Sequence, residues 1–126
     1  MHFLIVDDDS SVRRTLERVL KGAGYTADRG HRISYAENGD VCRRIVADDG
    51  PVDVIFMDGE LGPGDTGSVV VSRLREAGYT AKIIMTSSHA GMVQAGLTAG
   101  ANASCDKTDL YVKTLEVLTG FGVPPP

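Results

Sequence analysis

The sequence contains little cysteine, no long hydrophobic run and no block of positive charge, and each absence excludes a class of protein. The two cysteines are Cys42 and Cys105, and the segments that carry them are expected toward opposite edges of the fold. They are therefore predicted to be small buried hydrophobic residues rather than partners in a disulfide. The formal net charge of −4 repels a phosphate backbone, so direct binding to nucleic acid is not expected.

The hydrophobic segments are short, and none resembles a membrane span. The apolar run at the N-terminus has no charged leader and ends in three aspartates, far short of a secretory signal core. We therefore expect a cytoplasmic protein without membrane contact.

The composition is that of an ordinary globular protein, with 42% hydrophobic and 24% charged residues. A chain of 126 residues is large enough to bury one core without disulfides or structural metals. We expect one domain over residues 1–119, followed by a flexible C-terminal tail or truncated linker at 120–126, where glycine and proline oppose regular structure.

The chain is organised around residues 52–58, a run of β-forming residues that ends in Asp58 and a glycine-rich loop. Valine, isoleucine and phenylalanine on both faces of a strand are typical of a parallel sheet that is covered by helices. Four further strands and five helices are expected from the alternation of apolar and polar residues. The other strands are predicted at 3–6, 33–36, 82–85 and 102–106, and the helices at 10–21, 41–48, 66–77, 89–100 and 108–118.

Strand and helix alternate at short spacing, which predicts an α/β fold with a doubly wound, five-stranded parallel sheet and helices on both faces. The most hydrophobic strands, the first, third and fourth, are expected at the centre, and the second and fifth at the edges. The fourth helix is predicted to be frayed or mobile because Gly91 and Gly96 lie inside it, each at a cost of about 1 kcal/mol relative to alanine.

Five polar side chains follow strands whose carboxyl ends share one edge of such a sheet: Asp7, Asp8, Asp58, Thr86 and Lys107. Three carboxylates in one pocket repel one another, and oxygen ligands with room for water suit Mg²⁺. The backbone N–H groups of Gly59 and Ser87 can point into the same space. A metal, an ammonium group and N–H donors are what a transferring phosphoryl group requires.

Asp58 is the best-placed nucleophile for phosphorus, because it stands alone at its strand end. Its product would be an aspartyl phosphate, which water can hydrolyse. A temporary mark on the protein itself indicates a signalling switch rather than an enzyme with an external product.

Several short sequence motifs follow one another along the chain, and their order carries information in addition to their residues. They are Phe-Leu-Ile-Val before Asp7-Asp8-Asp9, Ala36-Glu37-Asn38-Gly39, Val-Ile-Phe-Met before Asp58, Ile-Met before Thr86-Ser87, Ala99-Gly100-Ala101, and Lys107. Together they are similar, over essentially the whole chain, to receiver domains of two-component response regulators, the family of the bacterial chemotaxis regulator.

The resemblance implies the flavodoxin-like strand order 2-1-3-4-5 and phosphotransfer to Asp58 from a sensor histidine kinase or a histidine phosphotransfer protein. It also implies that Asp8, Asp58 and the carbonyl of Glu60 hold Mg²⁺, with Asp7 acting mainly through water. The chain carries no recognisable effector, so output is expected by protein–protein contact or through a fused part of a larger protein.

The sequence departs from the family pattern at four places. Thr108 stands where the family has proline after its lysine, so the preceding peptide bond is expected to be trans. Ser104 replaces the aromatic residue that usually couples to the hydroxyl of the fourth strand. The segment 27–32 resembles an insertion with a surface role, and the loop after Asp58 is about one residue longer than usual.

Two other functions remain open from the sequence alone. Asp7-Asp8-Asp9-Ser10-Ser11 also fits the first motif of small haloacid-dehalogenase-like phosphatases, with Asp7 as nucleophile, but this interpretation leaves Asp58 without a role. A receiver-like module that binds partners without phosphorylation is favoured by Ser104 and Thr108 and opposed by the intact acidic pocket.

Overall fold

The computed structural model describes residues 1–62, 65–123 and 126, which form a five-stranded parallel sheet in the order β2-β1-β3-β4-β5. The strands are β1 (His2–Val6), β2 (Arg32–Ala36), β3 (Val54–Asp58), β4 (Lys82–Thr86) and β5 (Ala103–Cys105). The predicted fold class and strand order are confirmed, with the most hydrophobic strands at the centre and the two partly polar strands at the edges.

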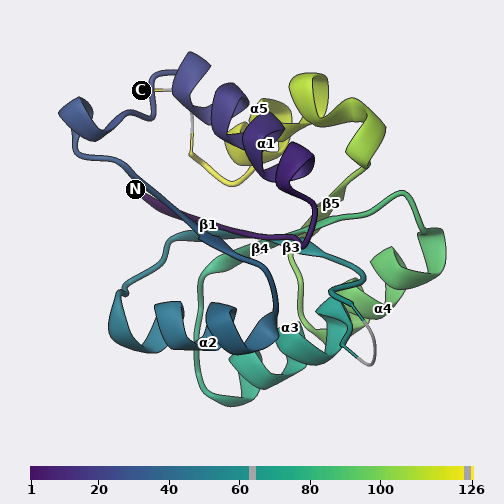
Figure 1. Ribbon diagram of the computed structural model, residues 1–126. Coiled ribbons are helices and arrows are strands. Elements are labelled where there is room, and N and C mark those ends of the chain that lie inside the picture. The colour runs from purple at the N-terminus through teal and green to yellow at the C-terminus, as the bar shows by residue number, and fades with distance from the viewer. Residues whose placement is uncertain (63–64, 124–125) are drawn as a thin grey trace.

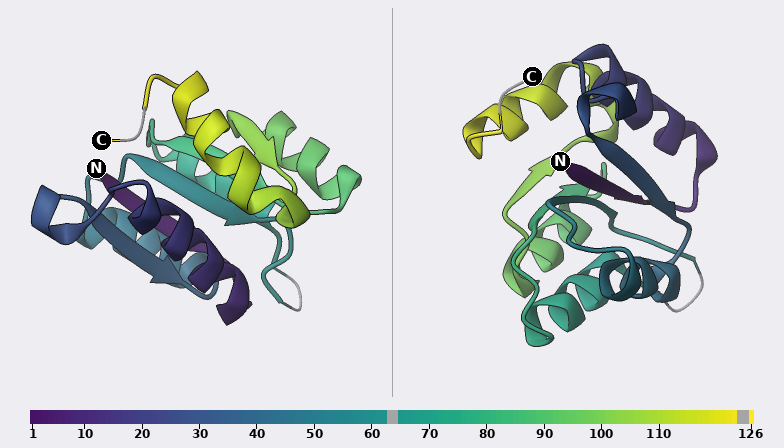
Figure 2. Two further views of the ribbon diagram at one scale, coloured as in Figure 1. Left: turned by 90° about the horizontal axis from the view of Figure 1, so that it is seen from above. Right: turned by 90° about the vertical axis from the view of Figure 1, so that its left-hand side faces the viewer.

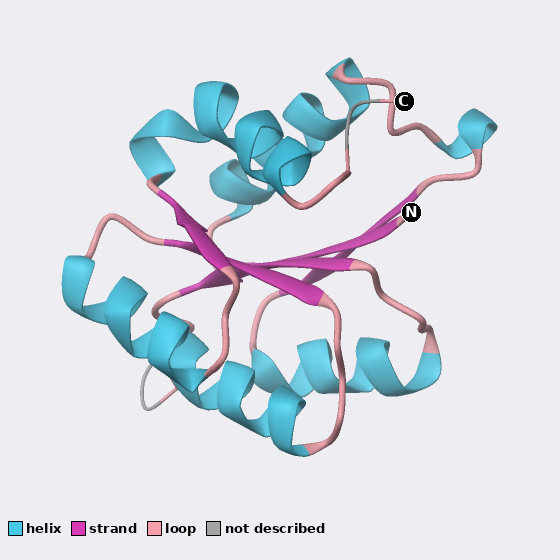
Figure 3. Cartoon of the chain, turned by 180° about the vertical axis from the view of Figure 1, so that it is seen from behind, coloured by secondary structure: helices cyan, strands magenta, loops and turns pink. Residues whose placement is uncertain are grey.

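Helices cover both faces of this sheet, as the ribbon shows (Figure 1) and the view from behind repeats (Figure 3). The helices α1 (Ser10–Gly22) and α5 (Leu110–Gly120) lie on one face, and α2 (Gly39–Asp48), α3 (Gly67–Glu76) and α4 (Ala90–Ala99) lie on the other. Two short 3₁₀ helices, η1 (Ala27–Arg29) and η2 (Lys107–Asp109), precede β2 and α5. Among the described residues, no helix combines the length and the hydrophobicity of a membrane span.

The central strands are buried on both faces because successive side chains point to opposite sides of the sheet. In β1, Leu4 packs with α2 and α3, whereas Phe3 packs with α1 and α5. The two cysteines confirm this division, because Cys42 lies in the first core and Cys105 in the second, both as free thiols.

The strand register brings the predicted site residues to one edge of the sheet. Val6 lies beside Met57, so that Asp7 follows next to Asp58. Asp58 pairs with Thr86, and Thr86 pairs with Cys105, which leads into Lys107. Short parallel strands that end at the same level therefore place four loops around one point.

The fourth helix differs from the prediction, because α4 is an uninterrupted helix of ten residues. The expectation of fraying rested on the propensity of glycine alone. A Cβ atom at Gly96 would lie 2.5 Å from the sulfur of Met85, so glycine lets α4 pack directly on β4. Tertiary packing here outweighs a weak local propensity.

Part of the predicted C-terminal tail packs against the rest of the chain. Gly120 belongs to α5, and Phe121 and Val123 pack against the core between α1 and α5. The hydroxyl of Tyr25 donates a hydrogen bond to the carbonyl of Val123 at 3.2 Å. The chain thereby returns to the N-terminal end of β1, away from the site edge (Figure 2). Residues 124–125 of the predicted tail lie outside the described residues.

Candidate functional site

A pocket of about 360 Å³ opens at the carboxyl ends of β1, β3 and β4. It is lined by Asp8, Asp9, Asp58, Glu60, Gly62, Ser87, Ser88, His89, Met92 and Lys107. Asp58 is the last residue of β3 and Lys107 the first residue of η2, and the others come from the loops after β1, β3 and β4 and from the start of α4. The pocket is therefore at the place where parallel α/β sheets bind their ligands.

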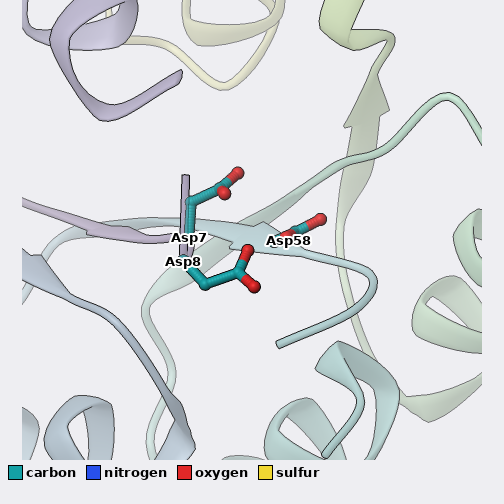
Figure 4. Close-up of side chains that lie close together, drawn as sticks. All are labelled: Asp7, Asp8 and Asp58. Atoms are coloured by element: carbon teal, nitrogen blue, oxygen red, sulfur yellow. The ribbon is translucent and has the colours of Figure 1, made fainter. Parts of the chain in front are cut away.

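Three carboxylates meet at this pocket. Asp7, Asp8 and Asp58 each offer an oxygen, and these oxygens lie within 4.8 Å of one another (Figure 4). Asp7 is fully buried and Asp58 is 4% exposed, whereas Asp8 is exposed to solvent. Of the two buried carboxylates, that of Asp58 lines the pocket and that of Asp7 does not.

The ammonium group of Lys107 joins the two buried carboxylates. Its Nζ atom lies 3.2 Å from Oδ2 of Asp7 and 3.0 Å from Oδ1 of Asp58. The other oxygen of Asp7 accepts a hydrogen bond of 2.9 Å from the backbone N–H of Asp9. Arg13 of α1 donates a hydrogen bond of 2.6 Å to the backbone carbonyl of Asp7. Both the side chain and the backbone of Asp7 are therefore held in place.

The pKa values reflect this arrangement. Burial raises the pKa of Asp7 from 3.8 to about 6, and the negative charge of Asp58 adds to this rise. The hydrogen bond from Asp9 and the charge of Lys107 offset it only in part. Burial alone would lower the pKa of Lys107, but its hydrogen bond to Asp58 and the negative charges of Asp7 and Asp58 outweigh burial, so the pKa is raised. Lys107 therefore stays positively charged beside the two carboxylates.

Thr86 and Ser87 take different places at the end of β4. Thr86 is 1% exposed and lies beside Asp58 in the sheet, whereas Ser87 lines the pocket itself. The hydroxyl of Ser87 accepts a hydrogen bond of 3.1 Å from the N–H of His89. A Cβ atom at Gly59 would lie 2.9 Å from Cβ of Met92. Glycine after Asp58 therefore leaves room for α4 to close one side of the pocket.

In a comparison with known protein families, residues 3–110 match the model of the response regulator receiver domain. The chain belongs to this family. Receiver domains of two-component response regulators are signalling modules that act as phosphate-accepting switches, and the family prediction made from the motifs is confirmed.

Individual relatives of this receiver domain agree with the assignment. It is 34% identical over 102 residues to the two-component response regulator ORR41 of Oryza sativa subsp. japonica, covering 79% of this chain and 76% of that protein. A CheY-like receiver domain from Methanospirillum hungatei JF-1 superposes with a TM-score of 0.73, at 22% identity and 94% coverage of both chains. The Mn²⁺-bound form of response regulator Rcp1 has a TM-score of 0.72, at 19% identity, covering 97% of this chain and 94% of the other.

The donor set of this receiver domain suits a hard divalent cation. All side-chain donors are carboxylate oxygens, and Glu60 lines the same pocket, where its carbonyl is predicted to contribute. Apart from its ion pair with Lys107, Oδ2 of Asp7 is buried without a hydrogen-bond partner among the described residues. Binding of Mg²⁺ at an acidic pocket is a property of the family, and the aspartates present here fit it.

The structure does not support the interpretation as a phosphatase with Asp7 as nucleophile. A nucleophilic Asp7 would have to reach an external phosphate, but its side chain is fully buried behind the pocket lining. Asp58, which that interpretation leaves without a role, lines the pocket instead.

The departures from the family pattern have simple structural outcomes. The peptide bond before Thr108 is trans, as predicted, because the cis bond found in the described residues is Gly50–Pro51. Ser104 is exposed on the edge strand β5. The predicted insertion at 27–32 contains η1 on the exposed surface. The longer loop after Asp58 includes residues 63–64, which lie outside the described part of the chain.

Sequence reasoning missed three residues around the site: Arg13, Met92 and Asp106. The spacing of Asp106 and Thr108 is that of a helix cap and could have been read from the sequence, since Asp106 accepts a hydrogen bond from the N–H of Thr108. Met92 has no such signal, because its place depends on how α4 packs.

Proposed function

We propose that this receiver domain accepts a phosphoryl group on Asp58 and so works as a phosphorylation-dependent switch. The observation that supports this best is the position of Lys107, whose ammonium group lies within 3.2 Å of both Asp7 and Asp58. A positive charge beside Asp58 reduces the repulsion between this carboxylate and an incoming anionic phosphoryl group.

In the proposed reaction, an oxygen of Asp58 forms a bond to phosphorus while the bond from phosphorus to the donor breaks. A phosphohistidine donor leaves as imidazole, which takes up a proton, and an acyl phosphate leaves as a carboxylate. The hydroxyl of Thr86 and the N–H groups of Gly59 and Ser87 are assigned as donors to the phosphoryl oxygens. Attack of water on the aspartyl phosphate regenerates Asp58 and releases inorganic phosphate.

Asp8, Asp58 and the carbonyl of Glu60 are proposed to hold Mg²⁺, with Asp7 acting mainly through water. When bound, the cation neutralises charge on the phosphoryl oxygens. Asp7 is assigned this indirect role because its buried side chain lies behind the pocket lining.

The partner that donates the phosphoryl group is proposed to be a sensor histidine kinase or a histidine phosphotransfer protein, and output is proposed to be protein–protein contact in the cytoplasm. Receiver domains interact with such kinases and phosphotransfer proteins as a family. The net charge of −4 speaks against direct contact with nucleic acid. The domain is proposed to span residues 1–119, and its only reactions are its own phosphorylation and dephosphorylation.

The test is the intact mass of the protein after incubation with Mg²⁺ and acetyl phosphate. Wild type is expected to gain one phosphoryl group, Asp58→Asn none, and Asp7→Asn a smaller fraction at the same time. The matched control is Asp40→Asn, which removes one exposed negative charge on α2 and is expected to behave as wild type.

Two results would overturn the proposal. An adduct in Asp58→Asn that is lost in Asp7→Asn, with turnover of free phosphate, would identify Asp7 as the acceptor. Absence of any adduct in folded wild type would favour a module that binds partners without phosphorylation.

A further inference from the structure

One carboxylate oxygen connects two walls of the pocket. Oδ1 of Asp106 accepts hydrogen bonds from the backbone N–H of Thr108 at 2.9 Å, from the hydroxyl of Thr108 at 2.9 Å and from the hydroxyl of Ser88 at 3.0 Å. Thr108 lies in η2, directly after Lys107, whereas Ser88 lies in the loop between β4 and α4. Two loops that are 18 residues apart in the chain are therefore joined through one side chain.

Both loops carry residues that line the pocket together with Asp58. Lys107 is the first residue of η2, and Asp106 is the N-cap of that turn. Ser87 and Ser88 line the pocket from the other loop. The side chain of Lys107 is 27% exposed and long, so its direction depends on the turn from which it leaves. Tilting η2 would move the ammonium group away from distances of 3.0 and 3.2 Å.

We propose that Asp106 is a positioning residue for the phosphoryl pocket. Its carboxylate holds the Lys107 turn and the Ser88 loop in one arrangement, so that the ammonium group and the Ser87 N–H face Asp58 together. Asp106 itself is exposed and is not part of the pocket lining. It therefore acts through Lys107 and the Ser88 loop, and this role rests on the proposed phosphorylation of Asp58.

The main experiment measures the rate of phosphorylation by acetyl phosphate, followed by intact mass in excess Mg²⁺, for four proteins besides wild type. They are Asp106→Ala, Asp106→Asn, Lys107→Ala and the double variant Asp106→Ala/Lys107→Ala. Asp106→Ala is expected to slow phosphorylation about tenfold, because small misplacements of a catalytic group are costly. Asp106→Asn retains an oxygen that accepts the same three bonds and is expected to stay within about twofold of wild type.

The double variant separates positioning from general stability. If Asp106 acts mainly through Lys107, its loss changes the rate much less once the ammonium group is absent, so the two effects are strongly non-additive. The matched control is Asn38→Ala, which removes the N-cap of α2, where Asn38 accepts a hydrogen bond of 2.9 Å from Val41. This variant loses a comparable cap outside the pocket lining and is expected to phosphorylate at the wild-type rate.

Two milder variants carry the test if Asp106→Ala fails to fold. Ser88→Ala breaks the link between the loops, and Thr108→Val removes one hydroxyl bond but keeps the backbone bond to Asp106. Ser88→Ala is expected to slow phosphorylation more than Thr108→Val. Equal, unchanged rates in both variants would overturn the proposal.

The outcomes distinguish this inference from the proposed function. If wild type forms the Asp58 adduct and folded Asp106→Ala forms it equally fast, the positioning role is wrong and the proposed function stands. A defect of full size in the Lys107→Ala background would show that Asp106 does not position Lys107, and that part of the proposal would be wrong. If wild type forms no adduct, the proposed function fails, and the positioning role fails with it.

Discussion

At the scale of single residues, the site carries more negative charge than its own side chains can balance. Three carboxylates lie within 4.8 Å of one another, and one ammonium group faces two of them. When all three carboxylates are ionised, the negative charge that the ammonium group leaves unbalanced equals the charge of one divalent cation. Without that cation, proton uptake is the other way to lower the repulsion, which agrees with the raised pKa of Asp7.

Asp7→Asn is expected to stabilise the metal-free protein at neutral pH. The folded pKa of Asp7 is about 6 and its ordinary value is 3.8, so the folded state binds the proton more tightly than the unfolded state does. The contribution of Asp7 to the free energy of unfolding therefore falls as the pH rises from 3.8 to about 6. In excess EDTA at about pH 7.5, the variant should gain about 2 to 3 kcal/mol, with little gain near pH 4.

Urea denaturation at several pH values measures this effect. Asp40→Asn removes the same charge from an exposed position on α2 and should show no such dependence on pH. A stability difference between Asp7→Asn and wild type that stays constant from about pH 4 to pH 7.5 would contradict the prediction.

The strand-end residues could be predicted from the sequence, but the contacts that join their loops could not. Asp7, Asp58 and Lys107 follow recognisable strands, and a parallel sheet brings such ends together whatever the loops do. The contact between Ser88 and Asp106 joins two loops, and no periodic pattern encodes the distance between loops. Loop contacts of this kind depend on the complete packing of the helices on either side.

At the scale of elements, α4 shows how tertiary packing can override a prediction based on helix propensity. The sequence correctly predicts a helix near residues 89–100, but it gives no indication that its two glycines differ. A Cβ atom at Gly91 would meet nothing within 4 Å, whereas one at Gly96 would lie 2.5 Å from the sulfur of Met85. One glycine is therefore a cost to the helix, and the other is required by the contact between α4 and β4.

Opposite effects are expected for alanine at these two glycines. Gly91→Ala should stabilise the protein by about 0.5 kcal/mol, because alanine loses less backbone entropy in a helix. Gly96→Ala should destabilise it by about 2 kcal/mol, because the new methyl group overpacks the buried Met85. Chemical denaturation of both variants tests the pair. Equal changes of the same sign would contradict the contact between Gly96 and Met85.

A glycine at the start of α3, Gly67, also allows a close contact, in this case with the backbone of Asp58. The N–H of Gly67 donates a hydrogen bond of 3.0 Å to the carbonyl of Gly59, and a Cβ atom at Gly67 would lie 2.0 Å from the carbonyl oxygen of Asp58. Gly67→Ala is therefore expected to displace the backbone of Asp58 and to destabilise the fold by about 3 kcal/mol.

Gly67→Ala should also slow phosphorylation by acetyl phosphate in the fraction that remains folded. Gly22→Ala is the matched control, because a Cβ atom at the end of α1 would meet nothing within 4 Å. Wild-type stability together with a wild-type phosphorylation rate in Gly67→Ala would show that α3 can move without disturbing Asp58.

At the scale of the whole molecule, two cores share one sheet, and the site lies where both end. The α1 and α5 side holds one core, and the α2, α3 and α4 side holds the other. The carboxylates follow β1 and β3, which contribute to both cores. A cation that binds these carboxylates should therefore stabilise the folded chain as a whole, not one loop, if unfolding is a single transition.

Mg²⁺ is expected to raise the stability of wild type, because it binds the carboxylates only where folding brings them together. At a free concentration 100-fold above the dissociation constant, the gain is about 2.7 kcal/mol, or a rise in Tm of about 10 °C for a chain of this size. Asp8→Asn and Asp58→Asn should lose most of this rise, whereas Asp40→Asn should keep it.

Thermal unfolding at matched ionic strength measures this effect. NaCl in place of MgCl₂ is the control, because salt alone screens the repulsion in a chain with net charge −4. An equal rise with NaCl, or an undiminished rise in both pocket variants, would show that the stabilisation comes from general screening and not from a cation at these three aspartates.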